Sequence, residues 1–280
     1  MNPTPLKTVL LTGAAGALGR VLMAPLRGVC QTLRLSDLPG PLAALGDPAA
    51  RPCDLADAAA VHALLQGVDA VVHLGGVAVE GPFEPILQAN LRGVHHLYEA
   101  ARRQGTKRVV FASSNHVTGG YEQGRRTHPD DPPRPDGHYG LSKLFGEGMA
   151  RLYWDRHGIE SVCLRIGTAT PDDRPPDRRA LATWLSHADL ARLVIASLTA
   201  PDVGCLVAYG MSDNPRGWWD TRDAWARLGY QPQDSAEVFA DEVQHLVFPP
   251  DTPMARLQGG SFLGLGPYDL PLQSDEERRP

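Results

Sequence analysis

Residues 8–19 read TVLLTGAAGALG, a strand-forming apolar run followed at once by Gly13, Gly16 and Gly19. A strand that feeds a glycine-rich turn and then a helix is the arrangement with which many proteins bind dinucleotides. The glycines permit the tight turn and let the backbone approach a pyrophosphate, whose charge meets the N-terminus of the helix. A glycine-rich turn without a ligand is the alternative, so the motif needs support from the rest of the chain.

A second strand-forming run, residues 32–36, ends at Asp37, 18 positions beyond Gly19. An acidic side chain at this place can accept both ribose hydroxyls of an adenosine and repels a 2′-phosphate. Leu38 and Pro39 follow, where an NADP enzyme often carries an arginine. The sequence therefore predicts NAD as the cofactor, and a solvated aspartate at a strand end is the alternative.

The rest of the chain alternates apolar runs with helical patterns. Strands that alternate with helices over short connections predict an α/β fold with a doubly wound parallel sheet. We expect one Rossmann-like domain over residues 1–280, with a small C-terminal substrate-binding portion drawn from residues 167–186 and 210–266. Residues from 249 onward should be irregular, and residues 267–280 should form a mobile tail. Further strands are expected at residues 53–55, 70–76, 108–112, 161–167 and 205–209, and helices at residues 57–66, 83–104, from 139 onward, 189–199, 217–230 and 234–245.

Tyr139 and Lys143 stand four positions apart in the stretch YGLSK, so on a helix they share one face. A tyrosine hydroxyl has a pKa near ~10 and is a poor base at neutral pH. A neighbouring ammonium and a positively charged nicotinamide would both lower that pKa. The pair would then suit removal of a proton from an alcohol as hydride leaves its carbon. A solvated helix face is the alternative, since the spacing alone is common.

Ser114 follows the strand expected at residues 108–112. Right-handed crossovers place the carboxyl ends of parallel strands at one edge of the sheet, where α/β proteins bind their ligands. The glycine loop, Ser114 and Tyr139 are therefore expected along one crevice.

Other residues with reactive side chains have weaker signals. His73 is interpreted as a packed histidine at a strand end and not as a catalyst. His95 and His96 are adjacent, which is not the spacing of a helical metal pair, and no carboxylate or cysteine cluster completes a site, so no metal is expected. Asp54 either contacts an adenine amino group or closes a turn, and the sequence leaves both open.

Composition narrows the class of protein. With 280 residues, 42% of them hydrophobic, the chain can bury one large core. A net charge of -5 offers no attraction to nucleic acid or to an anionic membrane. No stretch has the apolar length of a signal peptide or a membrane span. The four cysteines lack zinc or redox-motif spacing and are interpreted as small core residues in a reducing compartment. We expect a cytoplasmic homo-oligomer that binds neither nucleic acid nor membrane.

Taken together, these residues resemble the extended short-chain dehydrogenase/reductase superfamily over about the first 165 positions. The glycines follow the spacing Gly-x-x-Gly-x-x-Gly of that superfamily, and Asp37, Asp54-Leu55, Ser114 and Tyr139-x-x-x-Lys143 follow in its order. Within it the chain is similar to the uronate dehydrogenases. The stretches that carry this second resemblance are HLGG at 73–76, FASSNH at 111–116, RPDG at 134–137, WLSH at 184–187, GWWD at 217–220 and QGGSF at 258–262.

The resemblance implies oxidation of C1 of cyclic glucuronate or galacturonate by NAD, with an aldarolactone as product. Tyr139 would be the base, Lys143 would lower its pKa and hold the nicotinamide ribose, and Ser114 would bind the reacting hydroxyl. Substrate contacts would also come from Asn115, His116, Thr168, Arg179, which would pair with the carboxylate, and Phe262, which would close the pocket. Cofactor contacts would come from Gly13, Ala15, Gly16, Ala17, Leu18, Gly19, Asp37, Asp54, Leu55, Leu74, Gly75, Gly76, Asn90, Tyr139 and Lys143.

Two positions depart from the family's pattern. Ala78 stands where a serine usually contacts the sugar, and the loop with Arg174, Arg178 and Arg179 differs in length, which leaves the choice of arginine open. Two other functions compete with the dehydrogenase. A nucleotide-sugar epimerase or dehydratase would use the same tyrosine and lysine without net formation of NADH, although the chain is short for one. A non-catalytic NAD-binding protein is the third possibility.

Overall fold

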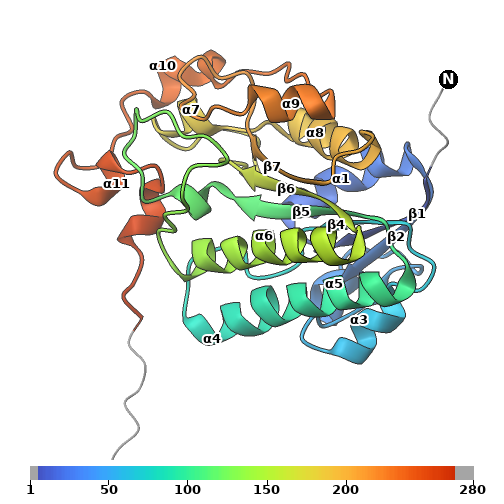
Figure 1. The fold of residues 1–280 in the computed structure, drawn as a ribbon. Coiled ribbons are helices and arrows are strands. Elements are labelled where there is room, and N and C mark those ends of the chain that lie inside the picture. The colour runs from blue at the N-terminus through green and yellow to red at the C-terminus, as the bar shows by residue number, and fades with distance from the viewer. Residues whose placement is uncertain (1–5, 269–280) are drawn as a thin grey trace, which may run out of the picture.

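The computed structural model describes residues 6–268 and, within that span, seven parallel strands in one sheet (Figure 1). Their order across the sheet is β3-β2-β1-β4-β5-β6-β7, so the chain builds outward from β1 in one direction and then in the other. The predicted α/β fold with a doubly wound parallel sheet is confirmed. The strands are β1 Leu6–Thr12, β2 Cys30–Asp37, β3 Arg51–Pro52, β4 Ala70–His73, β5 Arg108–Ser114, β6 Glu160–Ile166 and β7 Cys205–Gly210.

Helices cover both faces of the sheet (Figure 1). Helices α3, α5 and α6 pack on one face, and α1 and α8 pack together on the other. A π-helical turn at Leu87–Arg92 joins α4 to α5, so the helix predicted over residues 83–104 is continuous but distorted. The α-helices are α1 Ala17–Arg27, α2 Pro39–Ala43, α3 Ala58–Leu64, α4 Phe83–Ile86, α5 Gly93–Gln104, α6 His138–His157, α7 Ala180–Thr183, α8 His187–Thr199, α9 Arg222–Leu228, α10 Ala240–Val243 and α11 Pro253–Arg256.

The two helical layers create two hydrophobic cores, one on each side of the sheet. Successive strand residues point to opposite faces. Val9 and Leu11 therefore belong to the core beneath α1 and α8, while Leu10 between them belongs to the core beneath α3, α5 and α6. Because a parallel sheet is covered on both faces, its central strands are buried along their length, and all seven residues of β5 are buried.

Several predicted elements differ in the structure. The strand expected at residues 70–76 ends at His73, and the helix expected at residues 234–245 is a 3₁₀ turn at Ala236–Phe239 followed by α10. The short strand expected at residues 53–55 lies at β3, because its pairing partner β2 ends at Asp37. The helix expected from residue 217 begins only at α9, since Trp219 instead pairs with Thr127 as an isolated bridge. The segment after residue 249 contains α11, capped by the Thr252 side chain, and a 3₁₀ turn at Gly260–Gly264. The tail expected to be mobile at 267–280 lies outside the described residues from position 269 onward.

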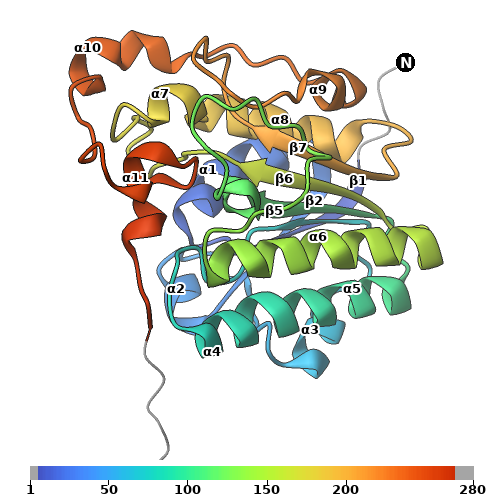
Figure 2. The ribbon, with the colours of Figure 1, turned by 60° about the vertical axis from the view of Figure 1, so that its left-hand side comes forward.

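The C-terminal segment owes its order to contacts far away in the sequence. Its backbone pairs with the loop that precedes α6, through Gln123 N to Arg256 O (2.7 Å) and Gly259 N to Gly119 O (2.9 Å). Figure 2 shows α11 and the turn after it lying beside that loop, above the N-terminal end of α6. This packing brings residues near position 260 to the carboxyl edge of the sheet.

Several smaller expectations can be compared with the described part of the chain. The cysteines are unpaired and pack in or against the hydrophobic cores, as predicted. His73 is buried, hydrogen-bonds Thr12 Oγ1 through Nδ1 (2.7 Å) and stacks on Phe111, which agrees with a packed residue. Within residues 6–268, no helix has the length and apolarity to cross a membrane, and no group of three or more His, Cys, Asp or Glu is placed to hold a metal ion.

Candidate active site

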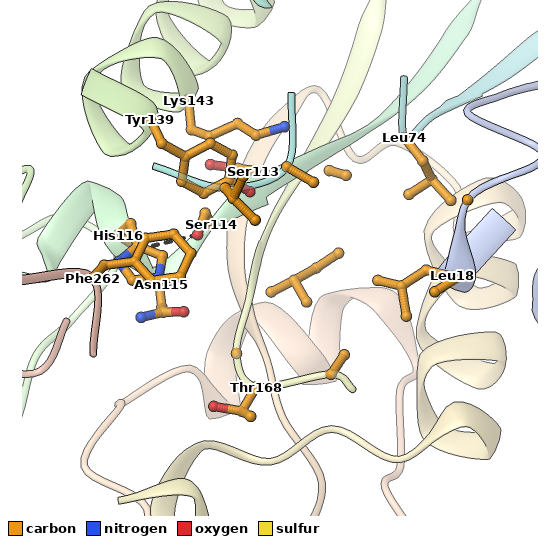
Figure 3. A pocket seen from close by; sticks show the side chains of 18 of the residues that line it. Leu18, Leu74, Ser113, Ser114, Asn115, His116, Tyr139, Lys143, Thr168 and Phe262 are labelled. Carbon is orange, nitrogen blue, oxygen red and sulfur yellow. Dashed lines mark hydrogen bonds between the residues drawn. The ribbon is translucent and has the colours of Figure 1, made fainter. Parts of the chain in front are cut away.

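Two cavities open at the carboxyl ends of the strands and share Gly13 and Val77 in their walls. The larger has a volume of about 550 Å³ and the smaller about 160 Å³. Figure 3 shows Tyr139, Ser114, His116 and Phe262 gathered on one side of the larger cavity, with Leu18 and Leu74 on the other. The sequence thus correctly predicted one crevice that combines the glycine loop, Ser114 and Tyr139.

The glycine loop forms one wall, and two of its glycines are required by geometry. Gly13 has φ of +68°, and a Cβ on it would lie 2.7 Å from the backbone of Leu74. A Cβ on Gly19 would lie 2.1 Å from the Gly13 carbonyl oxygen. Helix α1 starts directly behind the loop with no side-chain cap at Gly16. Its N-terminus therefore offers backbone N–H groups and the positive end of the helix dipole to an anionic ligand.

The smaller cavity lies beside Asp37 at the end of β2. One carboxylate oxygen of Asp37 accepts from Ala15 N (2.9 Å) and the other from Leu38 N (2.8 Å), which fixes the carboxylate at the cavity wall. Asp54 also lines this cavity, and its Oδ1 accepts from Ala56 N (2.9 Å). Asp54 therefore closes a turn and faces the cavity at once, so both interpretations of this residue stay open. The smaller cavity is also lined by Leu55, Gly75 and Gly76, and their contact with the cofactor stays a prediction.

Asn90 does not face either cavity. Its buried side chain holds the loop after β4, with Oδ1 accepting from Val77 N (2.8 Å) and Nδ2 donating to Val77 O (3.0 Å) and Ser142 Oγ (2.9 Å). Asn90 therefore has a structural role, which shapes the wall at Val77, and its contact with the cofactor stays a prediction. Ala15 likewise contributes its N–H to Asp37 and is not part of the cavity lining.

Helix α6 brings Tyr139 and Lys143 to the cavity, and its start is stabilised by a residue from another element. The N-terminal residue Gly137 has no side chain to cap the helix. Instead the Glu80 carboxylate accepts from His138 N (3.0 Å) and Tyr139 N (2.8 Å). Glu80 is thus a residue that positions the tyrosine, and sequence reasoning missed it because no local pattern links positions 80 and 139.

Burial controls the charges of the Tyr–Lys pair. Burial raises the pKa of Tyr139 to about 12, and the Asp136 carboxylate adds to the rise while a hydrogen bond with Ser114 opposes it. Burial also lowers the pKa of Lys143 to about 8. Desolvation thus outweighs the effects that lower the pKa of Tyr139 in the protein alone. The Nζ of Lys143 lies 5.4 Å from the centre of the tyrosine ring, and its lowering of the tyrosine pKa stays a prediction.

His116 has two neighbours that the sequence did not predict. Its Nδ1 donates to Asp136 Oδ2 (2.7 Å), and the Phe262 ring lies parallel to its own at 3.8 Å between centres. The Asp136 side chain is 1% exposed, so its carboxylate holds the imidazole from the side away from the solvent. The Tyr139 ring lies 5.8 Å from both aromatic rings. Imidazole and phenyl together close the cavity beside the tyrosine.

Of the three arginines left open by the sequence, Arg179 faces the cavity. Arg174 is exposed, pairs with Glu242 and lies over the Phe239 ring, and Arg178 is exposed. The Arg179 guanidinium donates from Nε to Gln258 O (2.6 Å) and from Nη1 to Thr168 Oγ1 (3.2 Å). Among residues 6–268 no carboxylate lies within ion-pairing distance of it. A guanidinium of this kind is suited to bind an anionic group in the cavity.

Comparison with known proteins agrees with this geometry. The model of the NAD dependent epimerase/dehydratase family matches residues 9–195. A uronate dehydrogenase of Pseudomonas syringae pv. tomato is 53% identical over 95% of this chain and 96% of its own length. The chain belongs to the uronate dehydrogenases of that family. A uronate dehydrogenase of Agrobacterium fabrum is 49% identical, with 92% of this chain and 97% of the relative covered.

Solved structures give the same result. A glucuronic acid dehydrogenase from Chromohalobacter salexigens is 45% identical with a TM-score of 0.87, over 93% of this chain and 98% of that one. A mutant uronate dehydrogenase from Agrobacterium tumefaciens, complexed with NAD, is 45% identical with a TM-score of 0.86. The match covers 95% of this chain and 100% of that one. The family resemblance and the NAD cofactor predicted from the sequence are both confirmed. Three features of this chain fit that cofactor: the glycine loop, the N-terminus of α1 and the Asp37 carboxylate.

Asp37→Ala should weaken NAD binding and narrow the preference for NAD over NADP, because the repulsion of a 2′-phosphate is removed. Titration of each variant with both cofactors, followed by protein fluorescence, measures the two affinities. Asp54→Ala is the companion variant, and weaker NAD binding there would favour the adenine contact over the turn. Equal use of NAD and NADP by the unmodified protein would contradict the role of Asp37.

Glu80→Ala should lower the free energy of unfolding by about 1–3 kcal/mol, because two buried N–H groups at the start of α6 lose their acceptor. Turnover should fall as well, since Tyr139 is the second residue of that helix. Urea titration and steady-state kinetics measure the two effects. Glu84→Ala is the control, since Glu84 is exposed and bonds only Gln88 Nε2 in the described chain; equal effects of both variants would show that the cap is unimportant.

Proposed function

We propose that the protein oxidises a hexuronate, glucuronate or galacturonate, at C1 of its cyclic form and releases an aldarolactone. The observation that carries the proposal is the Arg179 guanidinium, which shares one cavity with Tyr139 and Ser114 and has no carboxylate partner in the described chain. A hexuronate carries its alcohol at one end and its carboxylate at the other. The cavity offers a base at one end and a guanidinium at the other.

At the reacting end, NAD supplies the acceptor for the hydride that leaves C1. Ser114 positions the hydroxyl group, and Tyr139 removes its proton. The pKa of about 12 for Tyr139 in the protein alone means that the phenolate needs additional positive charge nearby. Lys143, on the same face of α6, contributes part of that charge, and its remaining role is to bind the nicotinamide ribose.

At the other end, the carboxylate would meet the Arg179 side chain between Thr168 and Asn115. With its amide nitrogen donating to Ile166 O (3.0 Å), Asn115 accepts through its oxygen from Nη2 of Arg179 (3.0 Å). His116 lies between the two ends, with Phe262 stacked on it, so sugar hydroxyls would contact the imidazole edge. Ala78 also lines the cavity, so the hydroxyl of the serine found elsewhere in the family is missing from this wall.

The carboxylate contact must supply the preference for uronates, because the net charge of -5 attracts no anion from a distance. A hydrogen bond to a charged group contributes roughly 1.5–3 kcal/mol. A nucleotide-sugar epimerase would need room for a second diphosphate beyond the sugar, where Gly259, Ser261 and Phe262 form the wall. The cytoplasmic location and the homo-oligomer expected from the sequence belong to the same proposal, and light scattering of the purified protein tests the second.

Tyr139→Phe should lower turnover by about 100-fold or more, the usual effect of losing a general base, and leave NAD binding nearly unchanged. Formation of NADH from galacturonate, measured by absorbance, gives the turnover, and titration calorimetry gives the affinity for NAD. A variant that keeps a tenth of the turnover would show that another group removes the proton.

Arg179→Ala should lower kcat/KM for uronates by about 10- to 150-fold and hardly change any activity on glucose or galactose. Arg179→Lys should restore only part of the loss, since lysine cannot form two parallel hydrogen bonds with a carboxylate. Arg174→Ala is the control, because that side chain is exposed and paired with Glu242. If the uronate-specific loss appears in the control and not in Arg179→Ala, the wrong arginine has been assigned.

A further inference from the structure

We propose that Gln258 is a positioning residue for substrate recognition: it holds the Arg179 guanidinium so that its two terminal nitrogens face the cavity. The inference rests on the proposed function, in which Arg179 binds the substrate carboxylate. Gln258 does not line the cavity and belongs to the C-terminal segment that packs on the loop before α6.

The Gln258 side chain is fully buried and has all its polar atoms bonded. Its Oε1 accepts from the indole Nε1 of Trp219 (3.0 Å). Its Nε2, with two hydrogens, lies within hydrogen-bond distance of three acceptors: the carbonyl oxygens of Glu122 (3.1 Å) and Arg125 (2.9 Å) and Thr127 Oγ1 (2.9 Å). A buried amide with this many partners has one orientation, and any other would leave several polar groups without a partner.

The backbone of Gln258 is held as firmly as its side chain. Its N–H donates to Tyr121 O (2.7 Å), and its carbonyl oxygen accepts from Arg179 Nε (2.6 Å). The side chain thus fixes the peptide unit whose carbonyl touches the arginine. The contact joins positions 79 residues apart in the sequence.

The carbonyl determines which nitrogens of the guanidinium a carboxylate can reach. An arginine can bind a carboxylate through Nε and one Nη, or through both Nη atoms. Since Nε is occupied by Gln258, the two Nη atoms remain for a carboxylate. In the structure they donate to neutral oxygens of Thr168 (3.2 Å), Thr183 (3.5 Å) and Asn115 (3.0 Å), which a carboxylate entering the cavity would replace. A carboxylate entering the cavity therefore meets a guanidinium whose rotation is already restricted, which lowers the entropy lost on binding.

The same segment passes very close to the arginine. Gly260 has φ of +60°, and a Cβ on it would lie 2.5 Å from Arg179 Cδ. Two residues later, Phe262 stacks on His116, whose ring centre lies 5.8 Å from that of Tyr139. The segment that Gln258 anchors therefore contacts Arg179 through Gly260 and His116 through Phe262.

Gln123 provides a matched control in the same region. Its Nε2 donates to the carbonyl oxygens of Met254 (3.3 Å) and Leu257 (3.1 Å), so it also attaches the C-terminal segment to the preceding loop. In the described chain, the Gln123 side chain forms no hydrogen bond with Arg179 or with the peptide carbonyl that Arg179 binds. Loss of Gln123 should loosen the segment without turning the guanidinium.

The test compares Gln258→Met, Gln123→Met, Arg179→Ala and the double variant Gln258→Met/Arg179→Ala. For each, kcat/KM is measured with galacturonate and with galactose, alongside the melting temperature. We expect Gln258→Met to lower the uronate-to-aldose ratio by about 5- to 20-fold, less than complete removal of the guanidinium. Gln123→Met should leave that ratio within about twofold, even if both methionine variants melt at a lower temperature.

The double variant decides whether Gln258 acts through the arginine. In the Arg179→Ala background, Gln258→Met should not change the ratio further, because effects that share one partner are not additive. Calorimetric binding of galactarate in the presence of NADH gives the same comparison if galactose reacts too slowly. Trp219→Phe, which removes the donor to Oε1, replaces Gln258→Met if the latter does not fold.

The outcomes separate the two proposals. If Arg179→Ala leaves the ratio unchanged, the carboxylate contact of the proposed function is wrong. If Arg179→Ala lowers the ratio but Gln258→Met does not, or does so equally in both backgrounds, Gln258 is not a positioning residue for the arginine. Equal changes in the two methionine variants would overturn the inference as well, since attachment of the segment alone would explain them.

Discussion

The buried ion pair between Glu147 and Arg165 joins α6, which carries Tyr139 and Lys143, to the sheet whose strand ends form the rest of the active site. Glu147 lies on α6 one turn beyond Lys143, and Arg165 lies near the end of β6; their side chains are 7% and 4% exposed. Two bonds join them, at 2.9 and 2.8 Å, and Ser113 Oγ donates to the same carboxylate (2.6 Å). Removing two charges from water is costly, so the pair is weak evidence for stability. Its effect here is on geometry. It fixes the position of α6, and so of Tyr139, relative to the end of β5 that carries Ser114.

The parts of the fold predicted from the sequence are those with a local cause. An apolar run such as residues 8–12, followed by glycines, needs only its own strand and turn chemistry to be recognised. The same holds for Tyr139 and Lys143, whose helical spacing is visible in five residues. His73 was interpreted correctly as a packed residue, since it ends an apolar strand and lacks a polar neighbour in the sequence.

The parts that were missed depend on contacts between distant positions. Glu80 caps α6 across 59 positions, and Gln258 reaches Arg179 across 79. No periodicity or motif reveals such pairs, because neither residue stands out from the polar residues of its own segment. The structural role of Asn90 was missed in the same way, because its hydrogen bonds to the Val77 backbone join positions 13 residues apart. The C-terminal segment was expected to be irregular for the same reason, since its order comes from the loop it packs on.

Desolvation is the main cause of the shifted pKa values in the site. Burial raises the pKa of Tyr139 and lowers those of Lys143 and Arg179, so the folded protein disfavours every charge that the reaction requires. These costs are met when the chain folds. A carboxylate that then reaches Arg179 loses its own hydration but meets a guanidinium that has already lost part of its water and is held in one orientation. Because the Arg179 guanidinium is partly desolvated, that attraction is stronger than between the same groups in water. The desolvation cost of a buried charged side chain is therefore offset only when a ligand of opposite charge binds beside it. The charge of the ligand thus becomes a criterion of recognition.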